Sequence, residues 1–182
     1  LGPQTVDFTA LVNALASLKL SEVSGPAFFS TGLDSGTLNF GSVTQGGGSV
    51  ETLLNLLNNV GGPADDLLGS IDTSNLSSTP FSFDGDASFD LAAGAGMDFG
   101  ISLNEDAATG FFTETITLDE ASHNAFQSDF ELPEYVLTVE GTIHSNSNTV
   151  PDAKNTLMLL ALGFGALVLF SCRAKKRASI GF

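Results

Sequence analysis

The fold is decided by residues 81–118, FSFDGDASFDLAAGAGMDFGISLNEDAATGFFTETITL, in the middle of a 182-residue chain. Apolar side chains recur here at every second position and alternate with polar residues or glycine. A period of two is the pattern of a strand with one buried and one solvated face, as in antiparallel sheets. We therefore predict half-buried antiparallel strands. One face carries Met97, Phe99, Ile101 and Leu103, and another carries Phe112, Ile116 and Leu118.

Similar patterns lie on both sides of this stretch. Strands are expected at 37–43, 49–58, 67–72 and 81–91, each bounded by Gly, Pro, Asn or Ser. About seven short strands in roughly 110 residues predict an antiparallel, immunoglobulin-like β-sandwich. The Leu-Leu-Asn-Leu-Leu run at 53–57 leaves a helical turn open as an alternative, which the neighbouring asparagines disfavour. The last strand has a face of Tyr135, Leu137, Val139 and Ile143.

The N-terminal segment has a different period. Residues 5–20, TVDFTALVNALASLKL, place apolar side chains at helical spacing, and Asp7 is a suitable N-cap. We predict one amphipathic helix there, within a lead-in of residues 1–36 that precedes a sandwich at 37–143. Because the chain begins at Leu1 rather than Met, we expect the lead-in to be the remnant of a longer chain. The predicted apolar stripe is Phe8, Leu11, Val12, Leu15 and Leu18.

The charge distribution is strongly asymmetric. Residues 1–149 hold 20 acidic residues and one basic residue, Lys19, so their net charge is 1 − 20 = −19. Nucleic acid is excluded as a partner, because phosphate binding needs a positive footprint. The sole cysteine, Cys172, lies near the C-terminus, so no disulfide can stabilise the acidic part. About 150 residues are enough to build one core by burial alone.

The order of motifs in the acidic part resembles the choice-of-anchor D group of bacterial surface domains, which is related to the immunoglobulin-like modules named after Hydin. The resemblance implies an immunoglobulin-like fold and a surface role. The segment 119–133 departs from it, being longer and more acidic than a plain hairpin. The matching positions are Phe40, Gly41, Val43 and Gly46, then Phe89 and Leu91, then 94–96, then Gly110, then Leu137 and Gly141.

One acidic loop is a candidate metal site. Asp84, Asp86 and Asp90 lie in FDGDASFD, and an Asp-Gly-Asp turn can direct two carboxylates toward one Ca²⁺ ion. The remaining positions of a calcium loop are not filled by ligands, so a solvated turn between strands is favoured. No other cofactor is expected.

Catalytic patterns are weak. The two histidines, His123 and His144, fall in polar segments, and no Gly-x-Ser-x-Gly nucleophile elbow is present. Abundant carboxylates have no diagnostic value for glycoside cleavage. We predict that the protein is not an enzyme.

The C-terminal tail has three parts. Residues 144–155 form a polar linker that carries a Val-Pro-Asp motif, and residues 156–172 contain no charge. As a helix, this uncharged run would be about 26 Å long, just enough to span a membrane. The basic residues that follow in 173–182 mark a cytoplasmic side, so everything before residue 150 is expected to be exported. These membrane-stop residues are Arg173, Lys175, Lys176 and Arg177.

Residues 150–177, VPDAKNTLMLLALGFGALVLFSCRAKKR, resemble the PEP-CTERM class of C-terminal sorting signals, nearest to its VPDSG variant. Val150, Pro151, Asp152 and Thr156 match that variant, whereas 153–155 depart from its Ser-Gly-Ser. The resemblance implies that an exosortase-like membrane enzyme processes the tail. An ordinary C-terminal membrane anchor is the alternative.

These features together predict an exported structural or adhesive protein. It would pass through the inner membrane, with residues 156–172 as a transmembrane helix, and reach the cell surface or an extracellular matrix, with surface polysaccharide as an expected partner. The alternative function is a membrane-anchored, Ca²⁺-dependent binding module.

Overall fold

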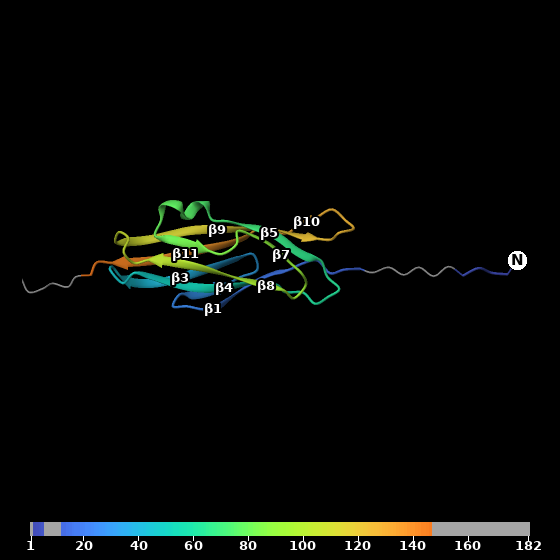
Figure 1. Ribbon diagram of the computed structural model, residues 1–182, viewed down its shortest axis with the longest axis horizontal. Coiled ribbons are helices and arrows are strands. Elements are labelled where there is room, and N and C mark those ends of the chain that lie inside the picture. The colour runs from blue at the N-terminus through green and yellow to red at the C-terminus, as the bar shows by residue number, and fades with distance from the viewer. Residues whose placement is uncertain (1, 6–11, 147–182) are drawn as a thin grey trace, which may run out of the picture. The chain divides into compact units, whose positions relative to one another are not determined.

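The computed structural model describes residues 2–5 and 12–146. Almost all of the regular structure in this part is β-strand, and the exception is one short 3-10 helix, η1 (Figure 1). The elements are β1 (Leu18–Ser24), β2 (Phe28–Thr31), β3 (Ser35–Thr44), β4 (Ser49–Asn58), β5 (Asp66–Asp72), η1 (Ser74–Ser78), β6 (Phe81–Asp84), β7 (Ser88–Leu91), β8 (Gly96–Asn104), β9 (Gly110–His123), β10 (Phe130–Glu131) and β11 (Tyr135–His144).

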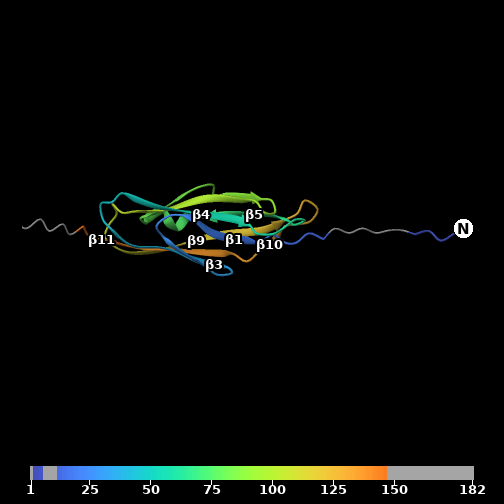
Figure 2. The ribbon, with the colours of Figure 1, turned by 90° about the horizontal axis from the view of Figure 1, so that it is seen from below.

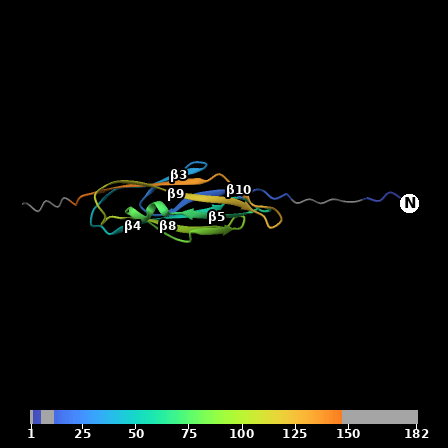
Figure 3. The ribbon, with the colours of Figure 1, turned by 90° about the horizontal axis from the view of Figure 1, so that it is seen from above.

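The strands form two sheets that face each other, so the predicted β-sandwich is confirmed (Figures 1 and 2). One sheet has the order β1-β4-β8-β6, and the other has the order β2-β3-β11-β9-β5-β7. The short β10 pairs with the end of β9 (Figure 3). All pairs are antiparallel except β3 with β11, which run parallel. The prediction of purely antiparallel pairing is therefore wrong for this pair, and the long stretch of chain between the two strands supplies the crossover that parallel pairing needs.

The core lies between the sheets and follows the predicted period of two. On β8, Phe99, Ile101 and Leu103 are buried, and β11 buries Tyr135 and the alternate residues after it. Each fully buried side chain of this size stabilises the fold by about 1.5–3 kcal/mol. The apolar positions that define the strands in sequence therefore also hold the two sheets together.

The N-terminal helix predicted at 5–20 is wrong within the described residues. Residues 12–17 are not helical, and β1 pairs with β4 from Leu18 onward. Val12 is 84% exposed and Leu15 is 49% exposed, whereas Ala16 and Leu20 are buried. Pairing with β4 gives this segment both ladder hydrogen bonds and burial, which outweigh its helical spacing. The sandwich therefore begins near residue 18 rather than at 37.

The strand predicted at 81–91 is two strands in different sheets. β6 pairs with β8, and β7 pairs with β5. The chain crosses between the sheets at Gly85, whose φ is +156° and whose position leaves no room for a Cβ beside Phe99. By contrast, residues 49–58 form one strand, so the helical-turn alternative does not occur.

The predicted fold class, a sandwich with a helix on each side, is therefore contradicted in its helical part, because the described residues contain no α-helix. None of the helical structure in residues 2–5 and 12–146 has the length and apolar character that a membrane crossing needs. The helix predicted at 156–172 lies outside the described residues, as do the sorting motif and the basic residues after 172.

Candidate functional site

The inward face of β9 changes from apolar to polar along the strand. Ile116 and Leu118 are fully buried, and the next two residues on the same face are Glu120 and Ser122, which are 8% and 2% exposed. Asn58, at the end of β4, and Asp65, just before β5, are buried at the same end of the sandwich. We call these four residues, Asn58, Asp65, Glu120 and Ser122, the polar end.

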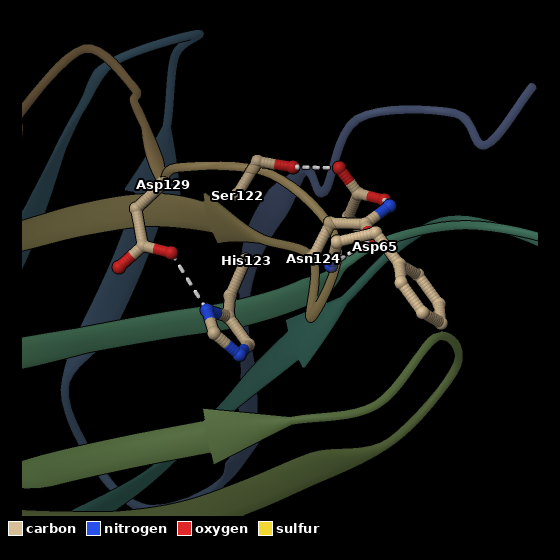
Figure 4. Close-up of polar contacts among 6 residues, drawn as sticks. Asp65, Ser122, His123, Asn124 and Asp129 are labelled. Atoms are coloured by element: carbon tan, nitrogen blue, oxygen red, sulfur yellow. Dashed lines mark hydrogen bonds and ion pairs between the residues drawn. The ribbon is translucent and has the colours of Figure 1, made fainter.

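The Asp65 carboxylate accepts three side-chain hydrogen bonds, and Figure 4 shows those from Ser122 and Asn124. Asn13 and Asn124 donate to Oδ1 at 3.1 Å and 2.9 Å, and the Ser122 hydroxyl donates to Oδ2 at 3.0 Å. Burial by itself would raise the pKa of Asp65, but the hydrogen bonds from Asn124, Asn13 and Ser122 outweigh it and lower the pKa. These bonds therefore favour the ionised form of Asp65, and its carboxylate joins neighbouring segments of the fold.

The polar end also fixes the segment before β1. The Ala16 amide donates to Ser122 Oγ at 2.9 Å, and the Ser17 amide donates to Asn58 Oδ1 at 3.2 Å. The Asp65 amide donates to the Ala14 carbonyl at 2.9 Å. Residues 13–17 are thus held across the polar end by backbone and side-chain bonds in place of a regular ladder.

Asn58 links three strands at this end. Its side-chain amide donates to the carbonyls of Asp65 and Leu91 at 3.1 Å and 3.0 Å. These carbonyls lie just before β5 and at the end of β7, while Asn58 itself ends β4. A buried amide with three partners satisfies most of its hydrogen-bonding capacity, so it fixes the spacing of the two sheets here.

Glu120 differs from its neighbours because one of its carboxyl oxygens, Oε2, is buried without a hydrogen-bond partner. Its side chain lines a cavity of about 420 Å³, together with Lys19, Asp34 and Tyr135. Burial, and then the negative charge of Asp34, raise the pKa of Glu120 to about 7. This carboxyl can gain or lose a proton near neutral pH, or accept a hydrogen bond from a donor that enters the cavity.

Two residues with hydroxyl groups, Thr31 and Tyr135, also line this cavity. Thr31 Oγ1 and the Tyr135 hydroxyl are 2.9 Å apart and hydrogen-bonded. Burial raises the pKa of Tyr135, and the bond with Thr31 partly offsets that effect. The cavity therefore combines a buried carboxyl, an exposed carboxyl and a hydroxyl pair.

His123 lies at the outer edge of this end. Its Nδ1 is 2.6 Å from Asp129 Oδ1, and both side chains are about two-fifths exposed, at 39% and 41% (Figure 4). The hydrogen bond to Asp129 raises the pKa of His123. The pair closes the β9–β10 hairpin, which is where the predicted acidic insertion at 119–133 falls. His144 is exposed at the end of β11.

The structure does not assemble the predicted calcium site. Asp84 ends β6, Asp86 lies in the turn, and Asp90 is on β7 in the other sheet, all of them exposed. Within the described ranges, no three His, Cys, Asp or Glu side chains are grouped so that they could hold a metal ion. The sorting residues Val150, Pro151, Asp152 and Thr156 lie outside the described residues.

The polar end was not predicted. One signal for it was present, because continuing the period of two from Ile116 places Glu120 and Ser122 on the inward face. The expected face of this strand stops at Leu118, because residues 119–133 resemble an acidic insertion. No sequence signal pairs Asp65 with Asn13 and Asn124, which are 52 and 59 residues away.

No protein-family model matches the chain, and no curated protein matches it. Among solved structures, the chain is similar to the ASH/PapD-like domain 7 of human CEP192, at 11% identity and a TM-score of 0.45 over 81% of this chain and 99% of that one. It is also similar to a protein of unknown function from Porphyromonas gingivalis W83, at 17% identity and a TM-score of 0.47 over 73% of this chain and 50% of that one.

A third similar structure is the VesB protease of Vibrio cholerae, at 13% identity and a TM-score of 0.42 over 64% of this chain and 32% of the protease. The chain spans about half of the Porphyromonas protein and about a third of the protease. The neighbours include PapD-like β-sandwich domains, but similarity this low carries no argument about function. The two family resemblances noted in the sequence therefore stay predictions.

Proposed function

We propose that this chain is an exported structural or adhesive domain of the cell surface or extracellular matrix, sorted by its C-terminal tail. The observation that carries the proposal is the division of the chain into two chemically opposite parts. An acidic sandwich with a single basic residue, Lys19, is followed by an uncharged segment and a basic cluster. Such an order suits a domain that leaves the cytoplasm while its basic end stays inside.

The geometry of the sandwich supports this arrangement. Ile143 of β11 pairs with Gly110, the first residue of β9, whereas Ser122 and the polar end lie at the other end of β9. The chain therefore leaves the sandwich at His144, at the end opposite the polar end (Figure 1). Five residues separate His144 from Val150, so the motif follows directly on a completed fold.

The proposed mechanism has three steps. The apolar segment 156–172 holds the chain at the inner membrane during export, with the basic residues on the cytoplasmic side. The Val150-Pro151-Asp152 motif is then presented on the outer side, and an exosortase-like enzyme cuts or transfers the chain there. The sandwich is then released, or is joined to a surface polymer.

A non-enzymatic role fits the positions of the histidines. His123 and its partner Asp129 lie on an exposed hairpin, where water screens their charges and competes for the proton. Adhesion has a candidate surface close by. The exposed residues Val12, Leu15 and Phe126 line a pocket that Asp65 also lines.

The sorting step is tested in the protein's own cells with the double variant Pro151→Ala, Asp152→Asn. Intact masses are compared between the membrane and extracellular fractions, and Asn146→Gln serves as the linker control. We expect the double variant to accumulate at full length in the membrane, while the wild type and the control lose the residues after the motif. Unchanged processing of the double variant would overturn the proposal.

A further inference from the structure

The cavity beside Glu120 has the features of a binding site. Its walls come from separate parts of the fold, which include β1, the end of β2 with the β2–β3 connection, β9, and the segment that leads from β10 into β11. At about 420 Å³ it is large enough for a side-chain-sized ligand. It lies at the polar end, which faces away from the point where the chain leaves the sandwich.

The unpartnered oxygen of Glu120 indicates which chemical group a ligand of this cavity would supply. A buried acceptor without a donor is costly, because it loses its hydrogen bonds to water and gains none in return. Asp34 places a second negative charge at the same cavity. The complementary group is therefore a positively charged hydrogen-bond donor.

A metal ion does not fit this description. The part of the chain at residues 12–146 has no cluster of three or more His, Cys, Asp or Glu side chains that could hold one. A compact ammonium needs fewer ligands, and it can also donate to hydroxyls such as the Thr31–Tyr135 pair. The cavity adds apolar walls from Leu33, Leu132 and Pro133, against which methylene groups can pack.

We propose that this cavity binds an alkylammonium group of the lysine side-chain kind, with the nitrogen between Glu120 and Asp34 and the methylenes against the apolar walls. The occupant is a lysine of a partner protein. This binding site does not depend on the sorting of the tail, so its test and the test of the proposed function can fail independently.

The chain's own Lys19 is the natural competitor. It lines the cavity, but it is exposed on β1, and within residues 12–146 the ion pair that forms is His123 with Asp129. Among the described residues, Lys19 thus forms no ion pair with either carboxyl of the cavity. Replacing it by methionine should leave binding intact or strengthen it.

The test is an NMR titration of the full chain in a nonionic detergent, with Nα-acetyl-lysine N-methylamide as the probe. We expect the amide signals around Glu120, Asp34 and Tyr135 to shift, and the norleucine analogue, which lacks the ammonium, to cause no such shift. Glu120→Gln should weaken binding about tenfold or more, because it removes a charged hydrogen bond. Asp119→Asn, a change at the exposed neighbour on β9, is the matched control and should bind normally.

The pH dependence separates a direct contact from a structural effect. Binding should strengthen as the pH rises from about 5 to about 8, since Glu120 must be ionised to hold the ammonium group. The other charged or titratable groups at the cavity are Asp34, Lys19 and Tyr135. The Glu120→Gln variant should lose this dependence while its spectrum remains that of a folded sandwich.

Four results would overturn the proposal. These are no shifts with the lysine probe, equal binding by Glu120→Gln, tighter binding of glucosamine, which would indicate a carbohydrate ligand, or displacement of the probe by Ca²⁺ in the wild type.

Discussion

Glu120 places a carboxyl in a row of β9 that otherwise buries Ile116 and Leu118. Burial and the charge of Asp34 raise its pKa in the folded state to about 7 from an ordinary value of 4.5. Protonation of Glu120 therefore stabilises the folded state. This stabilisation is complete below pH 4.5 and is lost as the pH rises to about 7. The loss amounts to about 3 kcal/mol of the free energy of unfolding.

We therefore predict that Glu120→Gln stabilises the protein above pH 7 and has little effect at about pH 4.5. Urea unfolding between these pH values measures the difference. Asp119→Asn controls for the general effect of removing one negative charge from an acidic domain. If both variants change stability equally at every pH, the assignment of a raised pKa to Glu120 is incorrect.

Ser122 connects two partners through one hydroxyl. It accepts from the Ala16 amide and donates to Asp65 Oδ2, and it is 2% exposed. Ser122→Ala leaves a buried amide unpaired and should lower the free energy of unfolding by about 1–3 kcal/mol. Thermal unfolding measures this, with Ser82→Ala on the exposed side of β6 as the control. A loss no larger than that of the control would show that the bonds to residues 13–17 contribute nothing.

At the scale of single residues, the sequence predicts the features that depend on local pattern and not those that depend on contacts between distant segments. The burial of Glu120 and Ser122 was accessible from the period of two, because a strand that continues past Leu118 must point them inward. Asp65 was not accessible in this way. Its neighbours Asn13 and Asn124 are polar residues in irregular segments, and only the pairing of distant strands brings them together.

Among the connections between elements, the turn from β1 to β2 depends on one glycine. Gly25 has a φ of +143°, and a Cβ there would lie 2.5 Å from the Cα of Thr52 on β4. Gly25→Ala is expected to destabilise the protein by more than about 1 kcal/mol, since both the conformation and the space exclude a side chain. Gly61→Ala is the matched control, because nothing lies within 4 Å of the corresponding Cβ position.

Chemical denaturation of the two glycine variants checks this prediction. Gly61→Ala should be neutral or slightly stabilising, because alanine restricts the unfolded chain. Equal stability of Gly25→Ala and the wild type would mean that the β1–β2 turn can move away from Thr52 at little cost.

Elements were predicted where local pattern and tertiary pairing agree. The strands at 97–103 and 135–143 have an alternating sequence pattern and lie in the interior of the sheets, so the pattern and the burial agree. At 49–58 the burial alternates although the run of leucines in the sequence does not. At 5–20 the local pattern and the tertiary pairing disagree, because the apolar spacing is helical while the segment from Leu18 onward pairs with β4. At 81–91 the apolar pattern continues through Gly85 and does not show that the chain changes sheets there.

At the scale of the whole molecule, the two proposed functions depend on opposite ends of β9. One end of that strand lies beside the residues that lead to the sorting motif, and the other end carries the polar residues and the cavity. The cavity and the residue at which the chain leaves the sandwich, His144, are therefore at opposite ends of the domain.

The net charge of the acidic part leads to a final prediction. With 19 more negative than positive charges in residues 1–149, self-repulsion lowers the stability of the folded sandwich. Raising NaCl from about 10 mM to about 150 mM shortens the screening length from about 30 Å to about 8 Å, and should raise Tm by about 2–5 °C. CaCl₂ at the same ionic strength should give a similar rise if screening alone operates. A larger rise with Ca²⁺ that Asp86→Asn removes would contradict this expectation, because it would require a specific ion bound between Asp84, Asp86 and Asp90.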